Sequence, residues 1–437
     1  MAKSKSEFLS FRRSSGREVA ANFSGGNISS DGGILLLREI DNKLGLTKQV
    51  ANILPDNRRQ SSVVHDMLTM LRQRVFGLAA GYEDLNDHDT LRNDIAIQTS
   101  VNSDKSLASS PTLCRFENSM PKELLFDMHK IFIQQFIDSY KLPPKELILD
   151  FDATDTILHG NQERKFYHGY YHNYCFLPLH VFCDKQLLVS YQRPSDQDGA
   201  KHSWAILALL VKAFRKEWPD VRIIFRGDGG FCRHRMFDWC ERNNVFYITG
   251  MPRNKILERL LAPTMQSVQD VFESTNEKQR EFISFQYQSK SWSRARKIVA
   301  KAEYSDKGSN PRFIVSNMSG DDDYLYDNIY CARGNMENDI KQIQLELFSD
   351  RMSCHKWDGN QFRLLLSSLA YILIDRMRAL CLKNTQLEKA QLGTIRLKLF
   401  KIGAVITKNT RKIKFLLSSH YPYQELFTRI LKKLVPI

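Results

Sequence analysis

Residues 147–152 read Leu-Ile-Leu-Asp-Phe-Asp, and residues 221–228 read Val-Arg-Ile-Ile-Phe-Arg-Gly-Asp. Each stretch is a short apolar run that closes on an aspartate, which is typical of a buried strand with a polar end. Asp150 and Asp152 are two residues apart, so in a strand both side chains point to one face. Two carboxylates on one partly buried face repel each other, and a divalent cation removes the repulsion. The alternative is a pair of surface residues at a strand end.

The segments around these two stretches predict a mixed sheet. Their order is β-β-β-α-β-α-β, and three strands in hairpin order followed by α/β alternation predict a mixed sheet with an antiparallel edge. Asp228 is flanked by Gly227 and Gly229, which permit a tight turn and the close approach of a ligand, although a simple strand-to-helix turn uses the same residues. The expected strands are 146–152, 174–183, 186–192, 221–226 and 245–249, and the expected helices are 203–218 and 236–243.

A third acidic residue, Glu337, lies far downstream in the sequence. Residues 331–349 are expected to form a helix, on which Arg333 and Glu337 are one turn apart on one face. Tyr330 lies a further turn back and Lys341 one turn ahead. This stripe is typical of a metal-binding carboxylate flanked by phosphate-holding groups, or of a solvent face with one ordinary ion pair. Two carboxylates at strand ends and a third on a helix are the ligands of a two-metal phosphoryl-transfer site.

The charge of the chain indicates a polyanionic partner. The 437 residues carry a formal charge of +14, and the pI is near 9.3. Residues 383–437 hold twelve Lys or Arg and two Glu. Such a cluster attracts nucleic acid, or else forms a solvated surface.

Other sequence features exclude several classes of protein. No apolar run reaches the ~18 residues that a membrane span requires. The eight cysteines lack a Cys-x-x-Cys pair, so they do not predict structural zinc and are expected to be reduced thiols. Residues 1–17 are basic and Ser-rich without the apolar stretch of a secretory signal, and are expected to form a mobile arm of a cytoplasmic protein.

The remaining chain divides into regions that differ in their pattern of apolar and polar residues. In the first region, helices are expected after Ser30 or Asp31, at 62–78 with Arg72 and Arg74 on its flanks, and at 122–140, before Pro143-Pro144 breaks the pattern. A short helical piece followed by alternating segments at 281–288, 297–303 and 312–316 predicts an inserted sheet, and residues 360–381 predict a buried helix. The expected divisions are a mainly helical, DNA-binding region at 1–142, a catalytic core at 143–250 and 330–382, a β-rich insertion at 251–329, and a basic region at 383–437.

These motifs resemble those of the DDE transposases of bacterial insertion sequences. The resemblance rests on Asp-x-Thr at residues 152–154, Arg-x-Asp-x-Gly-Phe at 226–231 and Tyr-x2-Arg-x3-Glu at 330–337. The strand order is similar to their RNase H-like core, and a β-rich insertion before the Glu helix is also shared. The resemblance spans most of the chain, including residues 31–37, 81–88, 107–113 and 394–404. It implies an α/β fold with an RNase H-like mixed β-sheet core, a β-rich insertion and a mainly helical N-terminal domain.

The resemblance also implies the site. Asp152, Asp228 and Glu337 would be the catalytic residues and would hold two Mg²⁺ ions, for which Mn²⁺ can substitute. Asp152 is preferred to Asp150 as the first ligand because it starts the Asp-x-Thr motif, and Asp150 remains an additional candidate. Tyr330 and Arg333 would hold phosphates. The family pattern has Lys seven residues after the Glu, where this chain has Gln344, and Lys341 is the nearest lysine.

The implied partner is double-stranded DNA, both the ends of the element and the target. A homodimer would bind this DNA, and no membrane partner is implied. The expected location is cytoplasmic, and nucleoid-associated when DNA is bound. Trp292 would stack on a displaced base or fill the core of a hairpin. The N-terminal helices would read the terminal repeats or only pack on the core. Further basic candidates for DNA contact are Arg12, Arg13, Arg17, Arg58, Arg59, Arg294, Arg296, Lys297, Lys408, Arg411, Lys412 and Lys414.

Two other functions remain compatible with the sequence. The first is an RNase H-like nuclease that cuts DNA but does not join it. The second is a catalytically silent DNA-binding derivative of a transposase, against which the three intact acidic residues count.

Overall fold

The computed structural model describes residues 8–435 of the chain. The described residues form two compact units, one of residues 8–117 with 369–435 and one of residues 118–368. The boundary near residue 368 falls within the apolar helix α13 (Trp357–Met377). No helix in the described range is both long and apolar enough to span a membrane.

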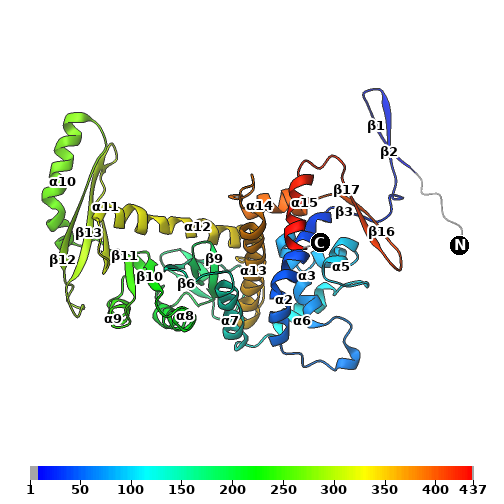
Figure 1. Ribbon diagram of the computed structural model, residues 1–437, viewed down its shortest axis with the longest axis horizontal. Helices are drawn as coiled ribbons and strands as arrows, with labels where there is room; N and C mark the ends of the chain where they lie inside the picture. The colour runs from blue at the N-terminus through cyan, green and yellow to red at the C-terminus, as the bar shows by residue number, and fades with distance from the viewer. Residues whose placement is uncertain (1–7, 436–437) are drawn as a thin grey trace. The chain divides into compact units, whose positions relative to one another are not determined.

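A nine-stranded sheet organises the unit of residues 118–368 (Figure 1). The order is β12-β13-β15-β11-β10-β4-β8-β9, and β14 pairs with β13. Strands β4, β10 and β11 are parallel, whereas β8 and β9 add an antiparallel edge. The part β9-β8-β4-β10-β11 has the strand order of an RNase H-like core, which confirms the predicted mixed sheet. The bounds are β4 (Glu146–Ala153), β8 (Leu179–Cys183), β9 (Gln186–Tyr191), β10 (Arg222–Gly227), β11 (Phe246–Met251), β12 (Gln279–Tyr287), β13 (Arg296–Ser305), β14 (Gly308–Ser309) and β15 (Arg312–Ser316).

The structure differs from the sequence prediction at one core strand. The expected strand 174–183 is two strands, because β7 (Asn173–Phe176) pairs with β5 (Thr156–Ile157) and β6 (Phe166–His168) in a separate small sheet. Pro178 lies between β7 and β8 and has no N–H to donate to a ladder.

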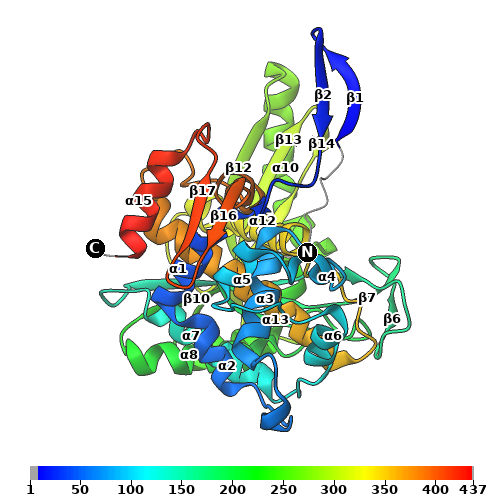
Figure 2. The ribbon, with the colours of Figure 1, turned by 90° about the vertical axis from the view of Figure 1, so that its right-hand side faces the viewer.

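The insertion strands extend the central sheet instead of forming a sheet of their own. Strand β15 pairs antiparallel with β11, with Val315 opposite Thr249, and β13 and β12 follow outward. The helix before them, expected to be short, is α10 (Lys255–Thr275), which packs along β12 and β13 (Figures 1 and 2). The central sheet therefore continues without a break into the insertion.

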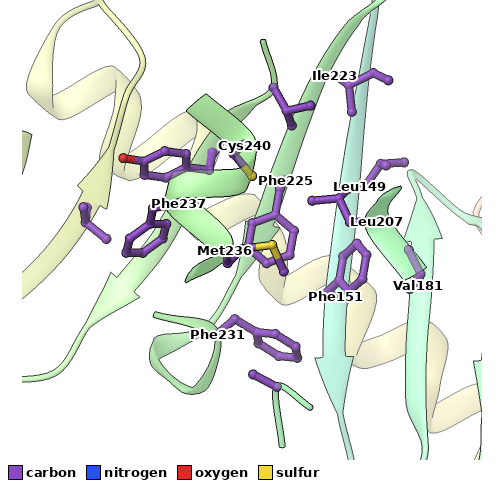
Figure 3. Close-up of a cluster of buried hydrophobic side chains, with 14 of the residues drawn as sticks. Leu149, Phe151, Val181, Leu207, Ile223, Phe225, Phe231, Met236, Phe237 and Cys240 are labelled. Carbon is purple, nitrogen blue, oxygen red and sulfur yellow. The ribbon is translucent and has the colours of Figure 1, made fainter. Parts of the chain in front are cut away.

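The alternation along β4 and β10 gives the sheet two different faces. Leu149 and Phe151 of β4 lie with Phe225 of β10 in the larger core (Figure 3). That face is covered by α7 (Leu124–Ile137), α8 (Ser203–Glu217), α9 (His234–Arg242) and α10. Ile148 and Ile224 point to the opposite face, as Asp150 and Asp152 must by the strand period.

A helical run from residue 322 to residue 346, here called the late helix, packs on this second face. Leu325, Tyr326 and Ile329 contact the isoleucines of β10, β11 and β15. The predicted helix 331–349 thus begins about two turns earlier, and it is not uniformly α-helical. It consists of α11 (Asp322–Tyr324), π-turns at η4 (Leu325–Tyr330), a 3₁₀ turn at η5 (Cys331–Arg333), α12 (Gly334–Lys341) and π-turns at η6 (Gln342–Glu346).

The other unit joins the two ends of the chain. Strand β3 (Ile28–Ser29) pairs with β16 (Ala404–Lys408), which pairs with β17 (Ile413–Leu417). The helices include α1 (Leu35–Leu44), α2 (Leu46–Ile53), α3 (Met67–Ala80), α5 (Ile95–Ser100), α6 (Ser110–Asn118) and α15 (Gln424–Leu434). The expected mobile arm of residues 1–17 contains strand β1 (Leu9–Ser14) and reaches the first residue of β2 (Arg17–Ala21), with which β1 forms a hairpin, while residues 1–7 of that arm lie outside the described residues.

Two arginines of α3, expected on the flanks of their helix, are instead buried in ion pairs. Arg72 lies 2.9 Å from Asp41, and Arg74 lies 2.7 Å from Glu117. The helix is apolar on most sides, so its charged positions are enclosed and require acidic partners.

Candidate active site

Asp152 and Asp228 leave the same edge of the sheet. Strands β4 and β10 are parallel neighbours, and Phe151 is level with Gly227. The next residue on each strand is therefore an aspartate at the same height. The sequence motifs at residues 152 and 228 are brought together by this register.

The turn after β10 depends on glycine. The Asp228 carboxylate accepts a hydrogen bond from the Gly230 N–H at 2.9 Å, which starts the turn. A Cβ on Gly227 would lie 2.9 Å from the Cβ of Phe231, which is buried against Phe151. Glycine at 227 thus allows the chain to turn tightly over the core and to present Asp228.

Arg333 lies among the three acidic residues. Its guanidinium is 2.7 Å from Glu337 and 3.8 Å from Asp152. Burial raises the pKa of Asp152 to about 7; the positive charge of Arg333 lowers it, and the negative charges of Asp228 and Glu337 raise it further. The three carboxylates are therefore close enough to influence one another, and Arg333 balances part of their charge.

Tyr330 approaches the same edge from the late helix. Its hydroxyl is 2.7 Å from the position that a Cβ on Gly250 would take, next to the Gly229 backbone. Burial raises the pKa of Tyr330, and the nearby Asp228 adds to this effect, whereas Arg333 opposes it. The hydroxyl therefore stays protonated at neutral pH and can donate a hydrogen bond.

Asp150 has a different environment from Asp152. It is opposite Arg226 in the β4–β10 register, and both of its carboxylate oxygens accept hydrogen bonds from the Arg226 guanidinium, one of them at 2.6 Å. Arg226 also donates to the main-chain carbonyl of Ile329. This arrangement favours Asp152 as the free carboxylate of β4.

The donor set suits a hard divalent cation, because all three side chains offer carboxylate oxygens. Among the residues that the structure describes, however, no three His, Cys, Asp or Glu side chains are gathered closely enough to hold a metal ion. The Glu337 side chain is 45% exposed and forms an ion pair with Arg333. The Asp228 carboxylate accepts a hydrogen bond from the Gly230 N–H within its own turn. The three side chains thus have the carboxylate oxygens that a divalent cation prefers, but Arg333 and the Gly230 N–H interact with them in this structure.

The other predicted site residues lie in several places. Lys341 is exposed on α12, one turn beyond Glu337. Trp292 is only 7% exposed and contacts Phe237 and Tyr287, so it fills a hairpin core, the second of its two expected positions.

The predicted basic residues divide into paired and free groups. Arg296 is buried between Asp238 and Glu241, and the exposed Arg294 also pairs with Glu241. Arg411 and Lys412 are exposed at the turn of the β16–β17 hairpin, in the other unit.

Sequence reasoning missed the contacts of two residues near the site. Arg226 was noted only as part of a motif, and Gln344 only as a departure from the family pattern. Gln344 donates a hydrogen bond to the main-chain carbonyl of Asp155 at 3.1 Å. Asp150 and Asp152 are two residues apart, and so are Arg226 and Asp228. This equal spacing was the available signal for the contact between Arg226 and Asp150.

Comparison with known proteins identifies a family for this chain. A family model described as "Transposase DDE domain group 1" matches residues 11–437. Among solved structures, a piggyBac transposase synaptic complex with hairpin DNA is similar, with 12% identity over 85% of this chain and 80% of that chain and a TM-score of 0.43. No curated protein sequence matches this chain.

Proposed function

This chain belongs to the family of transposases with a DDE domain (group 1), and from that premise we propose that it cuts DNA at the ends of an insertion sequence and joins those ends to a target. The observation that supports this proposal is that Arg333 pairs with Glu337 and lies 3.8 Å from Asp152, the carboxylate on which the charges of Asp228 and Glu337 act. The active unit on DNA would be a homodimer, in a cytoplasmic, nucleoid-associated location.

Asp152, Asp228 and Glu337 are the residues that would hold two Mg²⁺ ions, or Mn²⁺ in their place. When bound, the ions would activate the attacking oxygen and stabilise the leaving oxygen of an in-line displacement. The attacking group would be water in the cleavage step and a DNA 3′-hydroxyl in the joining step. The three carboxylates would fix the position of the reacting phosphate relative to Arg333 and Tyr330.

Arg333 and Tyr330 would hold the DNA backbone beside the cut. A guanidinium presents parallel N–H groups that match two phosphate oxygens. The protonated hydroxyl of Tyr330 can donate to a third oxygen. A phosphate bound here would compete with Glu337 for Arg333 and so release that carboxylate.

Replacement of Gly250 by alanine tests how closely Tyr330 must approach. The new Cβ would lie 2.7 Å from the Tyr330 hydroxyl and 2.8 Å from the Gly229 main-chain nitrogen, so Tyr330 and the Asp228 turn must shift. A displacement of about 1 Å costs on the order of 10² in rate, so we expect a fall of about 10²-fold in DNA cleavage. Gly403→Ala, where a Cβ meets nothing within 4 Å and φ is not in the left-handed region, tests instead the effect of an alanine outside the site. Equal rates for wild type and Gly250→Ala would contradict the proposed role of Tyr330.

Exposed basic residues of the β16–β17 hairpin would supply DNA affinity. Arg411 and Lys412 are exposed at its turn, Lys414 follows on β17, and Lys408 is paired with Asp104 at 2.8 Å. Changing Arg411 and Lys412 to glutamine is expected to weaken DNA binding equally for all sequences. The slope of log K against log salt should fall by about 2, because each phosphate contact contributes about 0.9.

The measurement is DNA affinity by fluorescence anisotropy at several salt concentrations. Changing Arg294 and Lys297 to glutamine is the matched control, since both are paired with acidic residues. An unchanged slope for the Arg411 and Lys412 variant would remove this hairpin from the DNA interface.

The raised pKa of Asp152 predicts a pH dependence of metal activation. A pKa of about 7 means that Asp152 holds a proton below neutral pH, and a metal ion must displace that proton. Cleavage at low Mg²⁺ should therefore fall as the pH drops from about 8 to 6. The midpoint should move to lower pH as Mg²⁺ rises, and a midpoint independent of Mg²⁺ would contradict this competition.

The experiment that tests the proposed function separates joining from cutting. The protein is incubated with a plasmid that carries the element and with a target plasmid, and the new junctions are sequenced. Joined element ends are the expected result. Cut ends without junctions would favour the nuclease, and binding without cutting would favour the silent derivative.

A further inference from the structure

The late helix carries Tyr330, Arg333 and Glu337, but as a helix it takes no part in the hydrogen-bonded ladders of the sheet. Its place over Asp152 must therefore be set by side-chain contacts. Two of the contacts near its functional residues reach strand β4 or the loop that follows it. One lies before Tyr330 and the other lies after Glu337.

The first contact is built on a buried ion pair. Arg226 and Asp150 are opposite each other on β10 and β4, and both side chains are more than nine-tenths buried. While two guanidinium nitrogens bind Asp150, a third donates to the carbonyl of Ile329, the residue before Tyr330. A guanidinium has a rigid, planar fork, so this arrangement fixes the π-helical turn relative to both strands.

The second contact lies at the other end of the late helix. The Gln344 side chain donates to the main-chain carbonyl of Asp155 at 3.1 Å, and its nitrogen is 3.4 Å from the Thr154 hydroxyl. Residues 154 and 155 directly follow β4, two and three residues after Asp152. The side chain of Gln344 therefore ties the helix to the loop that follows the first carboxylate.

Arg333 of the late helix lies 3.8 Å from Asp152 and pairs with Glu337 within the site itself. Two other ion pairs of the late helix reach the insertion strands. Asp327 pairs with Arg280 of β12 at 2.7 Å, and Asp322 pairs with Lys297 of β13 at 2.8 Å. Such partly exposed pairs contribute little to stability. They do not connect Glu337 to the strand that holds Asp152.

We propose that Arg226, through Asp150, and Gln344 are positioning residues that together set the separation of Glu337 from Asp152. This inference rests on the proposed function of those two carboxylates. Neither positioning residue touches the DNA or the reacting atoms. The position at which the family pattern has lysine serves in this chain as a neutral tether between the late helix and the loop after β4.

The test uses variants that remove each tether without leaving a buried charge. Asp150→Leu combined with Arg226→Met replaces the ion pair with apolar side chains, a change that is often neutral for stability. Gln344→Ala removes the second tether at a partly buried position, and Gln344→Lys keeps an N–H donor. Asp327→Asn is the matched control on the same helix.

The first measurement is hydrogen exchange of the amides of residues 325–346 in the full-length protein. Both tether variants should exchange about tenfold faster in this segment than wild type, while Gln344→Lys and Asp327→Asn should not. The second measurement is cleavage. The tether variants should cleave DNA about 10²-fold more slowly at unchanged DNA affinity. The ratio of Mn²⁺- to Mg²⁺-supported rates should rise, since Mg²⁺ demands stricter ligand geometry.

The two readouts separate this inference from the proposed function. If wild type cleaves DNA and both tether variants exchange and cleave as wild type does, the positioning role is wrong and the function stands. If wild type does not cleave DNA at all, the function is wrong, and hydrogen exchange alone decides whether the tethers hold the helix. Faster exchange in the Asp327→Asn control equal to that in the tether variants would also overturn the proposal.

Discussion

Changing Glu337 to glutamine, or Asp228 to asparagine, is expected to abolish Mg²⁺-dependent cleavage of element-end DNA while DNA binding persists. The amide side chains keep the shape of the acids but remove a negatively charged oxygen that would hold the metal. Loss of several kcal/mol of transition-state stabilisation corresponds to a rate at least about 10³-fold lower. The measurement is the cleavage rate of labelled end DNA at saturating protein, with affinity determined separately.

Asp327→Asn is the control for these two variants. Asp327 lies on the same late helix, but it pairs with Arg280 of the insertion and is not among the charges that act on Asp152. Its loss should leave the cleavage rate close to that of wild type. Undiminished cleavage by either Glu337→Gln or Asp228→Asn would show that the site has been assigned to the wrong residues.

Changing Arg74 to alanine is expected to destabilise the unit that contains it by about 3–5 kcal/mol, because it removes the cation that pairs with the buried Glu117 carboxylate. The Arg74 side chain is 1% exposed and that of Glu117 is 0% exposed, with 2.7 Å between their charged atoms. Arg74 also contacts the ring of His88, whose neutral form is favoured because burial lowers the pKa of His88 to about 3. Denaturant unfolding measures the loss.

A double variant measures what the charges of the Arg74–Glu117 pair contribute beyond the bulk of the two side chains. Arg74→Met with Glu117→Leu removes both charges and keeps similar volume, so most of the lost stability should return. Arg13→Ala, which breaks the exposed pair with Glu18, should have far less effect than Arg74→Ala. A double variant as unstable as Arg74→Ala would mean that the packing of these side chains, not charge balance, dominates.

The sequence predicted the centre of the fold because local patterns determine it. The apolar runs before Asp152 and Asp228 became adjacent parallel strands, since runs of this kind are stable only in a buried sheet. The spacing of Arg333 and Glu337 gave their ion pair directly, because a helix places such residues on one face. These features depend on residues that are near one another in the sequence.

Other features depend on pairings between distant segments, for which local patterns carry no signal. The pairing of β3 with β16 joins residues near 28 to residues near 405. The antiparallel pairing of β15 with β11, which merges the insertion with the central sheet, is of the same kind. The alternation of the insertion strands showed that they were strands but not which strand they would join.

Side-chain partners across strands were also beyond sequence reasoning. Asp150 and Asp152 share one face as expected, yet only Asp150 is bound by an arginine of the neighbouring strand, because the β4–β10 register places Arg226 opposite it. Likewise, the charged positions of α3 appeared to be flanking residues until Asp41 and Glu117 proved to be their partners. Register and packing, which decide such contacts, follow from the tertiary fold.

Metal binding by Asp152, Asp228 and Glu337 is tested most directly by titrating Mn²⁺ into the DNA-bound protein and following the free ion by electron paramagnetic resonance. Wild type should bind about two ions per site, the number used in two-metal phosphoryl transfer. A variant with Asp152→Asn, Asp228→Asn and Glu337→Gln should lose this binding while it still binds DNA. Equal Mn²⁺ binding by wild type and this variant would show that the three carboxylates are not the metal ligands.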